Sequence, residues 1–525
     1  MTPYKLTEAW DMIKETHVEN GWVRGVAGAD PHVISFKGIP FAAPPVGKLR
    51  WHAPMPAEDW EGVLDCCRFG AVSPQRAPWL VDNIYKKEWN VDPTLEMNED
   101  SLTLNIWTPA DTPEERLPVY VWYFGGGMME GNPTEMEFNG ERLARRGIVV
   151  VTVNYRLNVF GLLAHPEITA ENPEFPTNFG LLDQRFATMW VKRNIEAFGG
   201  DPENITIGGQ SGGGRSVQMQ VCSPLNKGLF QRAIVMSGIR YGGYEGPNNH
   251  GTCRTLEQAE ADGVDFFREA GIANLEEARA LSSEELIRRF SNYMGLEKGL
   301  QPGMKMWLPV ADGHFSTGNF CDQLITNKRN MVPLMFSNTA DESTLYPRAN
   351  TWEELRGIAE RNFGDRAEEF LSVIKADTLE DTIKNAGFSP LELGMRLNFE
   401  GTAKEHPEID NYGALFDAEI PGDDHPGSFH SSDLWFHFES LGACWRPFKG
   451  KSYDVARQIA NYVAAFVKTG DPNCCDVDGV PQAEWRPYTK CKGPMHYTDE
   501  CRQEEDSFVS PVMNFLVDYY LGTYR

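Results

Sequence analysis

Short apolar runs recur along the chain, separated by longer stretches in which apolar residues have helical spacing. Residues 119–123 (Val-Tyr-Val-Trp-Tyr) form one such run, and residues 148–155, rich in β-branched side chains, form another. Continuous runs of this length suit strands that are buried on both faces, as in a mostly parallel sheet. The same pattern predicts further strands at residues 205–207, 233–236 and 333–336.

Helical spacing marks the stretches between and after these runs. It predicts helices at residues 181–198, 212–222, 256–270, 352–363 and 453–467. Strands that alternate with helices indicate the α/β class, with a mostly parallel central sheet flanked by helices. No linker-like stretch and no internal repeat divides the sequence. We therefore expect one domain over residues 1–525, with a helical insertion around residues 251–290.

The composition narrows the classes of partner. Hydrophobic residues make up 41% and aromatic residues 11% of the 525 residues, which is enough for a large core. The formal net charge of −26 disfavours nucleic acid and anionic membranes, because both are negatively charged. The N-terminal residues lack the charged and apolar regions of a signal peptide, and no apolar run is long enough to span a bilayer. We therefore expect a soluble protein.

The ten cysteines do not have the pattern of a disulfide framework or of a zinc site. Cys66 and Cys67 are adjacent, as are Cys474 and Cys475, and no Cys-x-x-Cys or Cys/His spacing resembles a set of metal ligands. This usage favours reduced thiols in a cytoplasmic protein.

The sharpest chemical signal is the stretch Gly-Gln-Ser-Gly-Gly at residues 209–213, which fits the pattern Gly-x-Ser-x-Gly between a predicted strand and a predicted helix. A serine on such a tight turn has a strained backbone, and flanking glycines avoid clashes with its neighbours. The start of the following helix places N–H groups near developing negative charge. The pattern favours Ser211 as a nucleophile over the alternative of a serine that merely caps a helix.

A run of three glycines, Gly125 to Gly127, follows an earlier predicted strand. Acyl transfer passes through a tetrahedral oxyanion that needs two or three preorganised hydrogen-bond donors. A glycine run at the end of a strand exposes backbone N–H groups and lets a substrate approach closely. By itself the run is an ordinary turn; together with the serine motif it predicts an oxyanion site.

Several longer motifs in the same order resemble the type-B carboxylesterase family, which includes bacterial para-nitrobenzyl esterases and the cholinesterases. The resemblance implies the α/β-hydrolase fold and covers nearly the whole chain. The matching stretches are residues 36–45 (FKGIPFAAPP), 49–51 (LRW), 99–105 (EDSLTLN), 125–127 (GGG), 154–157 (NYRL), 160–161 (FG), 180–185 (GLLDQR) and 198–202 (FGGDP), followed by the serine motif.

The resemblance also implies a triad in the order serine, acid, histidine. The acid is expected in a turn after a late strand, which points to Glu342, with Asp341 as the alternative. The histidine lies later in the chain, and the family's histidine loop resembles residues 427–434, which contain His430. The other histidines after the acid are His406, His425, His437 and His496, and His425 is the one most easily confused with His430.

These residues imply hydrolysis of a small-molecule carboxylic ester without a metal or a cofactor. His430, oriented by Glu342, takes the proton of Ser211, and the resulting acyl-enzyme is hydrolysed by water. The backbone N–H groups of Gly126, Gly127 and Gly212 are expected to hold the oxyanion.

The chain departs from the family pattern at several positions. Gln210 stands where glutamate is common, which removes a negative charge beside the serine and weakens any preference for cationic substrates. Gly212 replaces the usual alanine and leaves its backbone less constrained. Ser101 stands where secreted relatives have a disulfide cysteine, in agreement with a reducing compartment.

The substrate pocket is less well defined by the sequence. Candidates to line it are Trp79, Met128, Met129, Trp307, Tyr346 and Trp435. Any single one of them is also an ordinary core residue by its type. Two other functions compete with a general esterase: a non-catalytic interaction protein of the same fold, and a hydrolase specialised for amides, carbamates or plant-derived aryl or sugar esters.

Overall fold

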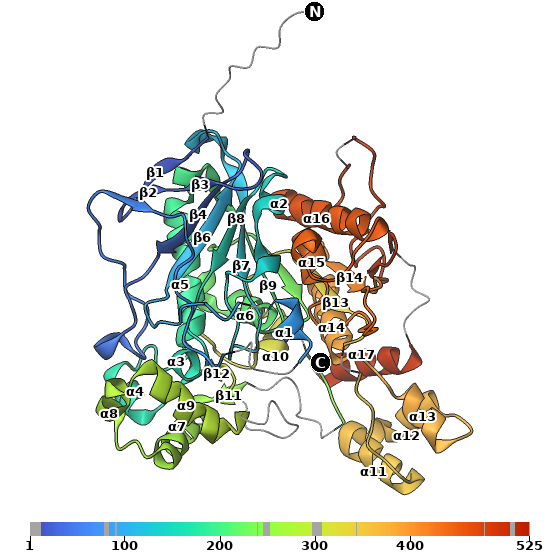
Figure 1. The fold of residues 1–525 in the computed structure, drawn as a ribbon. Helices are drawn as coiled ribbons and strands as arrows, with labels where there is room; N and C mark the ends of the chain where they lie inside the picture. Colours follow the sequence, from blue (N-terminus) through green and yellow to red (C-terminus); the bar gives the residue numbers. More distant parts are fainter. Residues whose placement is uncertain are drawn as a thin grey trace, which may run out of the picture.

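The computed structural model describes residues 12–77, 83–89, 92–238, 240–244, 253–296, 307–342, 344–476, 478–503 and 510–523. Its centre is an eleven-stranded sheet with the strand order β16-β15-β14-β13-β10-β9-β7-β8-β6-β4-β3 (Figure 1). The strands are β3 Val26–Ala27, β4 Ile34–Pro40, β6 Thr103–Thr108, β7 Leu117–Tyr123, β8 Val149–Val153, β9 Gly200–Gln210, β10 Arg232–Met236, β13 Leu334–Thr339, β14 Tyr412–Phe416, β15 Met495–Tyr497 and β16 Cys501–Gln503.

The middle of this sheet is parallel and its edges are antiparallel. Neighbouring strands run parallel from β8 through β7, β9, β10, β13 and β14 to β15. The pairs β16–β15, β8–β6, β6–β4 and β4–β3 are antiparallel. Every residue of β8 and of β13 is buried, as expected for strands covered on both faces. The predicted α/β class and the mostly parallel sheet are confirmed.

Two small sheets lie apart from the central one. The first consists of β1 Glu15–Val18, β2 Gly21–Arg24 and β5 Val63–Asp65, and the second of β11 Arg254–Thr255 and β12 Val310–Ala311.

Helices pack on the central sheet and extend beyond it. They are α1 Tyr85–Glu88, α2 Glu141–Ala144, α3 Asn158–Leu162, α4 Pro166–Glu171, α5 Phe179–Asn194, α6 Gly212–Cys222, α7 Leu256–Ala270, α8 Leu275–Ala280, α9 Ser283–Met294, α10 Phe320–Ile325, α11 Trp352–Phe363, α12 Ala367–Ile374, α13 Leu379–Asn385, α14 Pro390–Glu405, α15 Leu434–His437, α16 Lys451–Thr469 and α17 Pro511–Thr523. The segment predicted as a helical insertion contains α7, α8 and most of α9, and these three helices lie together at one side of the molecule (Figure 1). That they form an insertion stays a prediction.

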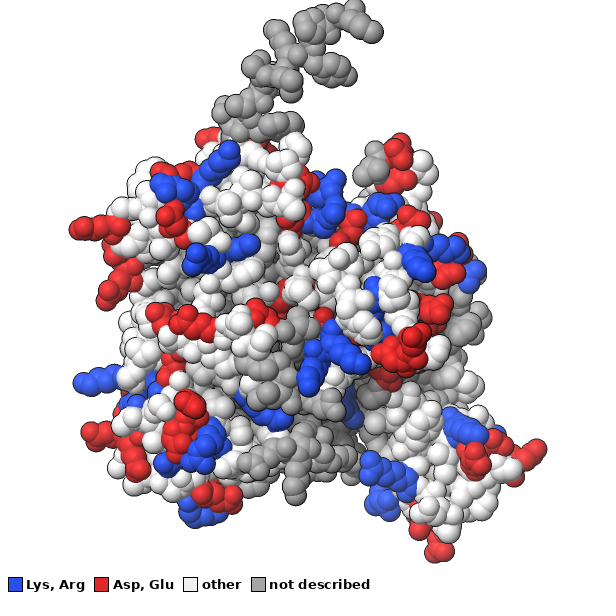
Figure 2. Space-filling model, in the orientation of Figure 1, with Lys and Arg blue, Asp and Glu red and all other residues white. Residues whose placement is uncertain are grey.

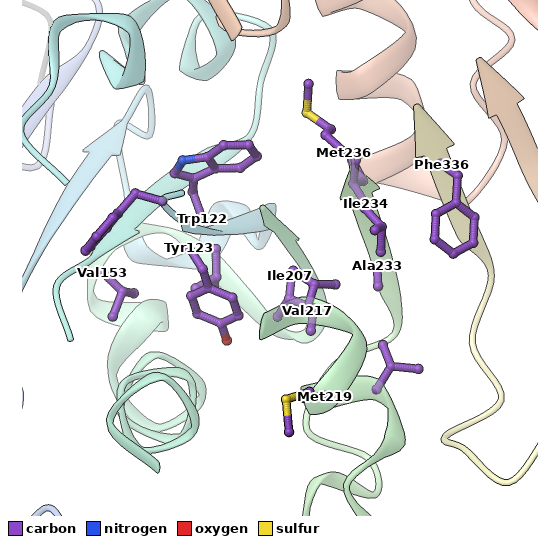
Figure 3. Close-up of a cluster of buried hydrophobic side chains, with 14 of the residues drawn as sticks. Trp122, Tyr123, Val153, Ile207, Val217, Met219, Ala233, Ile234, Met236 and Phe336 are labelled. Atoms are coloured by element: carbon purple, nitrogen blue, oxygen red, sulfur yellow. The ribbon is translucent and has the colours of Figure 1, made fainter. Parts of the chain in front are cut away.

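The core of the molecule lies between the sheet and the helices on its two faces. Trp122 and Tyr123 are neighbours on β7, and Figure 3 shows their side chains on opposite sides of the sheet, as the alternation along a strand requires. Val217 on α6 lies beside Ile207 of β9 in the same view. Helix α6 packs on β9 and β10 in this way, so its first residue is held at the carboxyl edge of the central parallel strands.

The surface of the molecule carries acidic and basic side chains side by side. On the face that Figure 2 shows, the two kinds are interspersed rather than gathered into one patch. All ten cysteines lie in the described part of the chain, and each of them is free of a disulfide. Within the described residues, no helix combines the length and the apolar character needed to cross a membrane.

Candidate active site

The turn between β9 and α6 holds Ser211 in a strained backbone conformation. Its φ is +56° and its ψ is −119°, a region that residues other than glycine rarely adopt. A Cβ at Gly209 would lie 2.5 Å from the backbone of Gly213, and a Cβ at Gly213 would lie 2.0 Å from the carbonyl oxygen of Tyr123. Close backbone packing therefore requires glycine at both motif positions, and it fixes the place of Ser211.

His430 and Glu342 lie in line with Ser211, although the three residues are far apart in the sequence. The Nε2 atom of His430 is 2.8 Å from the Oγ of Ser211, and its Nδ1 is 3.1 Å from Oε2 of Glu342. Glu342 also accepts hydrogen bonds from the hydroxyl of Ser237 and, at 3.0 Å, from the N–H of Thr339. The side chain of Glu342 is 3% exposed and that of His430 is 34% exposed. A buried acid thus orients an accessible imidazole toward the serine hydroxyl.

The alternative acid and the alternative histidine have other positions. Asp341 is exposed and accepts a hydrogen bond at 2.8 Å from the N–H of Ser428, so it anchors the loop that carries His430. His425 is exposed on that loop. The structure therefore brings Glu342 and His430 to Ser211.

Burial and hydrogen bonding act in opposite directions on the two ionisable groups beside Ser211. Burial favours the neutral form of Glu342, but the hydrogen bond and the charge of His430, with the bonds from Ser237 and Thr339, hold the pKa of Glu342 below its usual value. Burial also acts to lower the pKa of His430, but the hydrogen bond and the charge of Glu342 raise this pKa above its usual value. The carboxylate is therefore ionised at neutral pH and favours a protonated imidazole beside it.

A further acid, Asp433, lies buried close to these groups. Both of its carboxylate oxygens are sealed from solvent and have no hydrogen-bond partner within the described part of the chain. Burial and then the charge of Glu342 raise the pKa of Asp433 to about 7. Asp433 and His437 line a cavity of about 20 Å³, which has room for one water molecule. Asp433 therefore remains largely neutral in mildly acidic solution, and where it ionises its charge adds to that of Glu342 in raising the pKa of His430.

The glycine run lies against the serine turn. Gly126 and Gly127 have φ values of +93° and +65°, which glycine adopts freely. A Cβ at Gly126 would lie 2.0 Å from the carbonyl oxygen of Glu130, so a side chain is excluded there. A Cβ at Gly212 would lie 2.8 Å from the backbone nitrogen of Gly127. The three predicted oxyanion residues therefore adjoin one another beside Ser211.

Two residues beside the site are missing from the sequence prediction. Tyr85 of α1 donates a hydrogen bond at 3.4 Å to the carbonyl oxygen of His430. Burial, followed by the charges of Glu342 and Glu130, raises the pKa of Tyr85 to about 12. Ser237 directly follows β10, and its position at the carboxyl end of a central parallel strand was a signal that could have identified it. The stretch around Tyr85 offers no comparable signal.

Gln210, which is predicted to remove a negative charge beside Ser211, lies close to the imidazole of His430. Its amide nitrogen lies 3.4 Å from Nε2 of His430. A neutral amide thus lies next to Nε2 of the imidazole at the position where the family pattern has a carboxylate, whereas the charge of Glu342 lies at Nδ1.

The residues predicted to line the substrate pocket lie in different parts of the structure and differ in their exposure. Met128 is buried and Met129 is half-buried, and both directly follow the glycine run, where the N–H of Met129 bonds to the carbonyl oxygen of Gly126 at 3.0 Å. Tyr346 is 49% exposed, and its ring lies where a Cβ on Gly387 would be. Trp79 lies outside the described residues. Contact of the two methionines and of Tyr346 with a substrate stays a prediction.

Two of the pocket candidates are buried among other aromatic rings. Trp435 is 1% exposed, with its ring 6.4 Å from that of Trp89. Trp307 packs against Phe266 of α7 and Phe290 of α9, with ring centroids 5.7 Å and 4.9 Å away. Both are packed as core residues are, and their contact with a substrate stays a prediction.

Over the described ranges, no three His, Cys, Asp or Glu side chains are clustered to hold an ion. The arrangement at Ser211 supplies instead a nucleophilic hydroxyl, a base in contact with it, an acid that orients the base, and backbone donors beside them. These are the parts that acyl transfer needs.

Comparison with known proteins gives a consistent result. A family model described as the carboxylesterase family matches residues 13–389. A fumonisin B1 esterase of Sphingopyxis macrogoltabida is 31% identical over 434 residues, which cover 81% of this chain and 75% of that protein. The para-nitrobenzyl esterase of Bacillus subtilis (strain 168) is 30% identical over 489 residues, which cover 90% of this chain and 91% of that protein.

Solved structures agree with these matches. A PNB esterase has a TM-score of 0.74 and 27% sequence identity, with 95% of this chain and 98% of that chain covered. A carboxylesterase of Geobacillus stearothermophilus has a TM-score of 0.72 and 28% identity, with 94% and 98% covered.

Proposed function

The chain belongs to the carboxylesterase family, has the α/β-hydrolase fold and is a carboxylic-ester hydrolase, and from this premise we propose that it works through an acyl-enzyme on Ser211. The observation that carries the proposal is the unbroken line of contacts from the Oγ of Ser211 through both ring nitrogens of His430 to Glu342. A serine hydroxyl is a weak nucleophile by itself, and an adjacent base oriented by a third group is what activates it.

In the first half of the reaction, His430 acts as general base. Its Nε2 takes the proton from Ser211 as the Oγ attacks the ester carbonyl carbon. The carbonyl oxygen becomes negatively charged and accepts hydrogen bonds from the N–H groups of Gly126, Gly127 and Gly212. The intermediate collapses when the C–O bond to the alcohol breaks and His430 returns the proton to the leaving alkoxide.

In the second half, water replaces the alcohol. His430 takes a proton from the water as its oxygen attacks the acyl-enzyme carbonyl, and the same backbone donors hold the second oxyanion. The bond to the Oγ then breaks, Ser211 regains its proton from His430, and the carboxylic acid leaves. Glu342 remains ionised throughout and stabilises the imidazolium that forms in each half.

The type of reaction does not by itself identify the ester that the protein hydrolyses in the cell. The relatives are named for different substrates, para-nitrobenzyl esters and fumonisin B1. A non-catalytic role as an interaction protein is disfavoured by the contacts of Ser211, His430 and Glu342, because such a protein has no need to keep a nucleophile, a base and an acid in line. A panel of aryl, benzyl and sugar esters, fumonisin B1 and a matched anilide would rank the substrate classes.

Hydrolysis of para-nitrophenyl acetate and butyrate tests the proposal. We expect turnover by the wild-type protein and a loss of about 10⁴-fold or more in kcat for Ser211→Ala, because the covalent step has no other nucleophile. Ser452→Ala, a serine substitution on α16 at one end of that helix, is the matched control and should leave the rate within about twofold. A folded Ser211→Ala protein with the wild-type rate would rule out this nucleophile.

A further inference from the structure

Arg215 lies on α6, one helical turn after Ser211, and its charge stands without a partner in the described part of the chain. It is half-buried, and its guanidinium makes no hydrogen bond or ion pair with any described residue. An arginine that loses part of its hydration without gaining an acid is costly for the folded protein.

The other buried and half-buried arginines that the structure describes show what is usual in this chain. Arg156 is bound by Asp183 through two nitrogens at 2.8 Å and 2.6 Å, with both side chains 3% exposed or less. Arg446 contacts Glu88 at 2.7 Å, with both side chains fully buried. Others have no acid but donate to carbonyl or amide oxygens, as Arg329, Arg185 and Arg232 do. Among the described arginines that are buried or half-buried, Arg215 is the one without a hydrogen bond or an ion pair.

Helix geometry places this unpaired charge near the nucleophile. The N–H of Arg215 bonds to the carbonyl oxygen of Ser211 at 2.9 Å, so the two residues are one helical turn apart and share a face. Their α-carbons are separated by about 6 Å along the helix axis, and helical side chains lean back toward the N-terminus. An arginine at this position is long enough to reach the end of α6 at which Ser211 lies, and its charge also acts on the thiol of Cys321 on α10.

A second arginine approaches from the loop after β10. Gly238 packs so closely on the start of α6 that a Cβ on it would lie 2.8 Å from the backbone nitrogen of Arg215. This contact brings Arg240, two residues later, close to Arg215. Arg240 is exposed, and its side chain makes no hydrogen bond or ion pair with the residues that the structure describes. The loop is fixed by the bond from the thiol of Cys321 on α10 to the carbonyl oxygen of Arg240.

The electrostatics of this arginine pair are unfavourable as the chain stands. Burial lowers the pKa of Arg215, the neighbouring thiol of Cys321 acts in the opposite direction, and the charge of Arg240 lowers the pKa again by repulsion. Two neighbouring guanidinium groups that lack an acid attract an anion. A carboxylate bound between them would offset both the repulsion and the lost hydration.

We infer that Arg215 and Arg240 bind a free carboxylate of the substrate, so that this hydrolase prefers esters that carry a carboxylate on one of their two halves. The inference rests on the proposed function, since it takes Ser211 as the point at which the ester is cleaved. The two sources of the carboxylate are the acyl half, as in a monoester of a dicarboxylic acid, and the alcohol half, as in an ester of a hydroxy acid.

Matched pairs of esters test this inference. For the acyl half, mono-4-nitrobenzyl succinate is compared with 4-nitrobenzyl 4-oxopentanoate, in which a methyl ketone replaces the carboxylate. For the alcohol half, 4-carboxybenzyl acetate is compared with 4-methylbenzyl acetate. The quantity measured is the ratio of kcat/KM for the charged ester to kcat/KM for its neutral counterpart. We expect this ratio to exceed one for wild-type protein in one of the two pairs, which identifies the half that carries the charge.

Substitution at the arginines connects that preference to the site. Arg215→Gln should lower the ratio about 10- to 100-fold, because hydrogen bonds to a charged group are lost. Arg215→Lys should lower it less, since it keeps the charge but loses the two-pronged geometry. Arg240→Gln changes an exposed side chain and should lower the ratio in the same direction. Lys227→Gln, an exposed lysine beyond the other end of α6, removes the same charge at a distance and should leave the ratio unchanged.

The outcomes separate this inference from the proposed function. A ratio of one or less in both pairs, or a ratio that Arg215→Gln and Arg240→Gln leave intact, would overturn the carboxylate site while hydrolysis of the neutral esters still depended on Ser211. If the wild-type protein cleaved no ester, or if Ser211→Ala cleaved them all, the proposed function itself would fail. Turnover of the neutral esters by each arginine variant shows that the variant is folded.

Discussion

Two groups of ionisable side chains lie near the turn at Ser211, and they differ in how their charges are matched. At His430 the base and the acid are paired, and Glu342 accepts hydrogen bonds from His430, Ser237 and Thr339. Among the described residues no acid pairs with Arg215, and the neighbouring charge of Arg240 has the same sign. The acid and base at Ser211 are thus matched within the chain, whereas Arg215 lacks a counter-ion among the described residues.

This difference indicates that the two groups of side chains have different functions. Hydrogen bonds from several sides hold Glu342 and His430 in one geometry, as a reaction repeated on every ester requires. An unpaired charge beside the reaction site gives no structural stability, and an anion from outside is what it can bind. We therefore expect changes around His430 to affect all esters alike and changes around Arg215 to affect charged esters alone.

The largest effect in this comparison is expected for His430→Ala. It removes the base, so turnover of charged and neutral esters should fall about 10⁴-fold. His425→Ala is the matched control on the same loop and should stay near the wild-type rate, because His425 is exposed. Rates with para-nitrophenyl butyrate measure both variants. The opposite result, a silent His430→Ala and an inactive His425→Ala, would transfer the role of base to His425.

A smaller loss of kcat/KM, about 10³-fold for both kinds of ester, is expected for Glu342→Gln, since the imidazole keeps its place but loses the charge that stabilises its protonated form.

A further prediction concerns the pH dependence of kcat/KM. Glu342 raises the pKa of His430, and the protonated imidazole is inactive as a base, so the wild-type kcat/KM should fall with acid at a midpoint above the usual histidine value.

In Glu342→Gln the midpoint of this acid limb should move to lower pH, because the raising charge is gone. Profiles of kcat/KM from about pH 5 to 9 for both proteins measure the shift. Asp341→Asn is the control: Asp341 bonds to the N–H of Ser428 instead of to the imidazole, so this variant should keep the wild-type midpoint. Equal midpoints in wild-type and Glu342→Gln would show that Glu342 does not set the pKa of His430.

The smallest predicted effect is that of salt. Attraction between the arginines and a substrate carboxylate is screened as ionic strength rises, so kcat/KM for the charged ester should fall about 3- to 10-fold between about 0.02 M and 0.5 M sodium chloride. The neutral ester of the same pair should change by less than about twofold. Arg215→Gln should flatten the salt response of the charged ester, and a response that is just as steep without Arg215 would place the attraction elsewhere.

Much of the group around His430 could be predicted from the sequence, because its signals are local. The glycines of the serine turn are required by contacts within a few residues, and the predicted helix at 212–222 agrees with α6. Residues 256–270 and 352–363 likewise agree with α7 and α11. Glu342 and His430 were reached through the resemblance, since nothing local brings residues 88 positions apart into contact.

The group around Arg215 could not be predicted in this way. An arginine on a helix is ordinarily solvated or paired, and the lack of a partner depends on every segment that folds around it. The same non-local dependence applies to Trp435 and Trp307, whose burial is decided by packing from distant parts of the chain. Sequence patterns indicate what a residue is able to do, and the fold determines which of its possible partners are present.

The account depends most directly on Ser211 as the nucleophile, and covalent labelling measures this. The wild-type protein is treated with a fluorophosphonate, digested, and the modified peptide is identified by mass spectrometry. We predict a single adduct on the peptide that contains Ser211, together with loss of ester turnover in proportion to labelling, and no adduct in Ser211→Ala. An adduct on another serine, or full turnover by protein that is fully labelled at Ser211, would contradict the account.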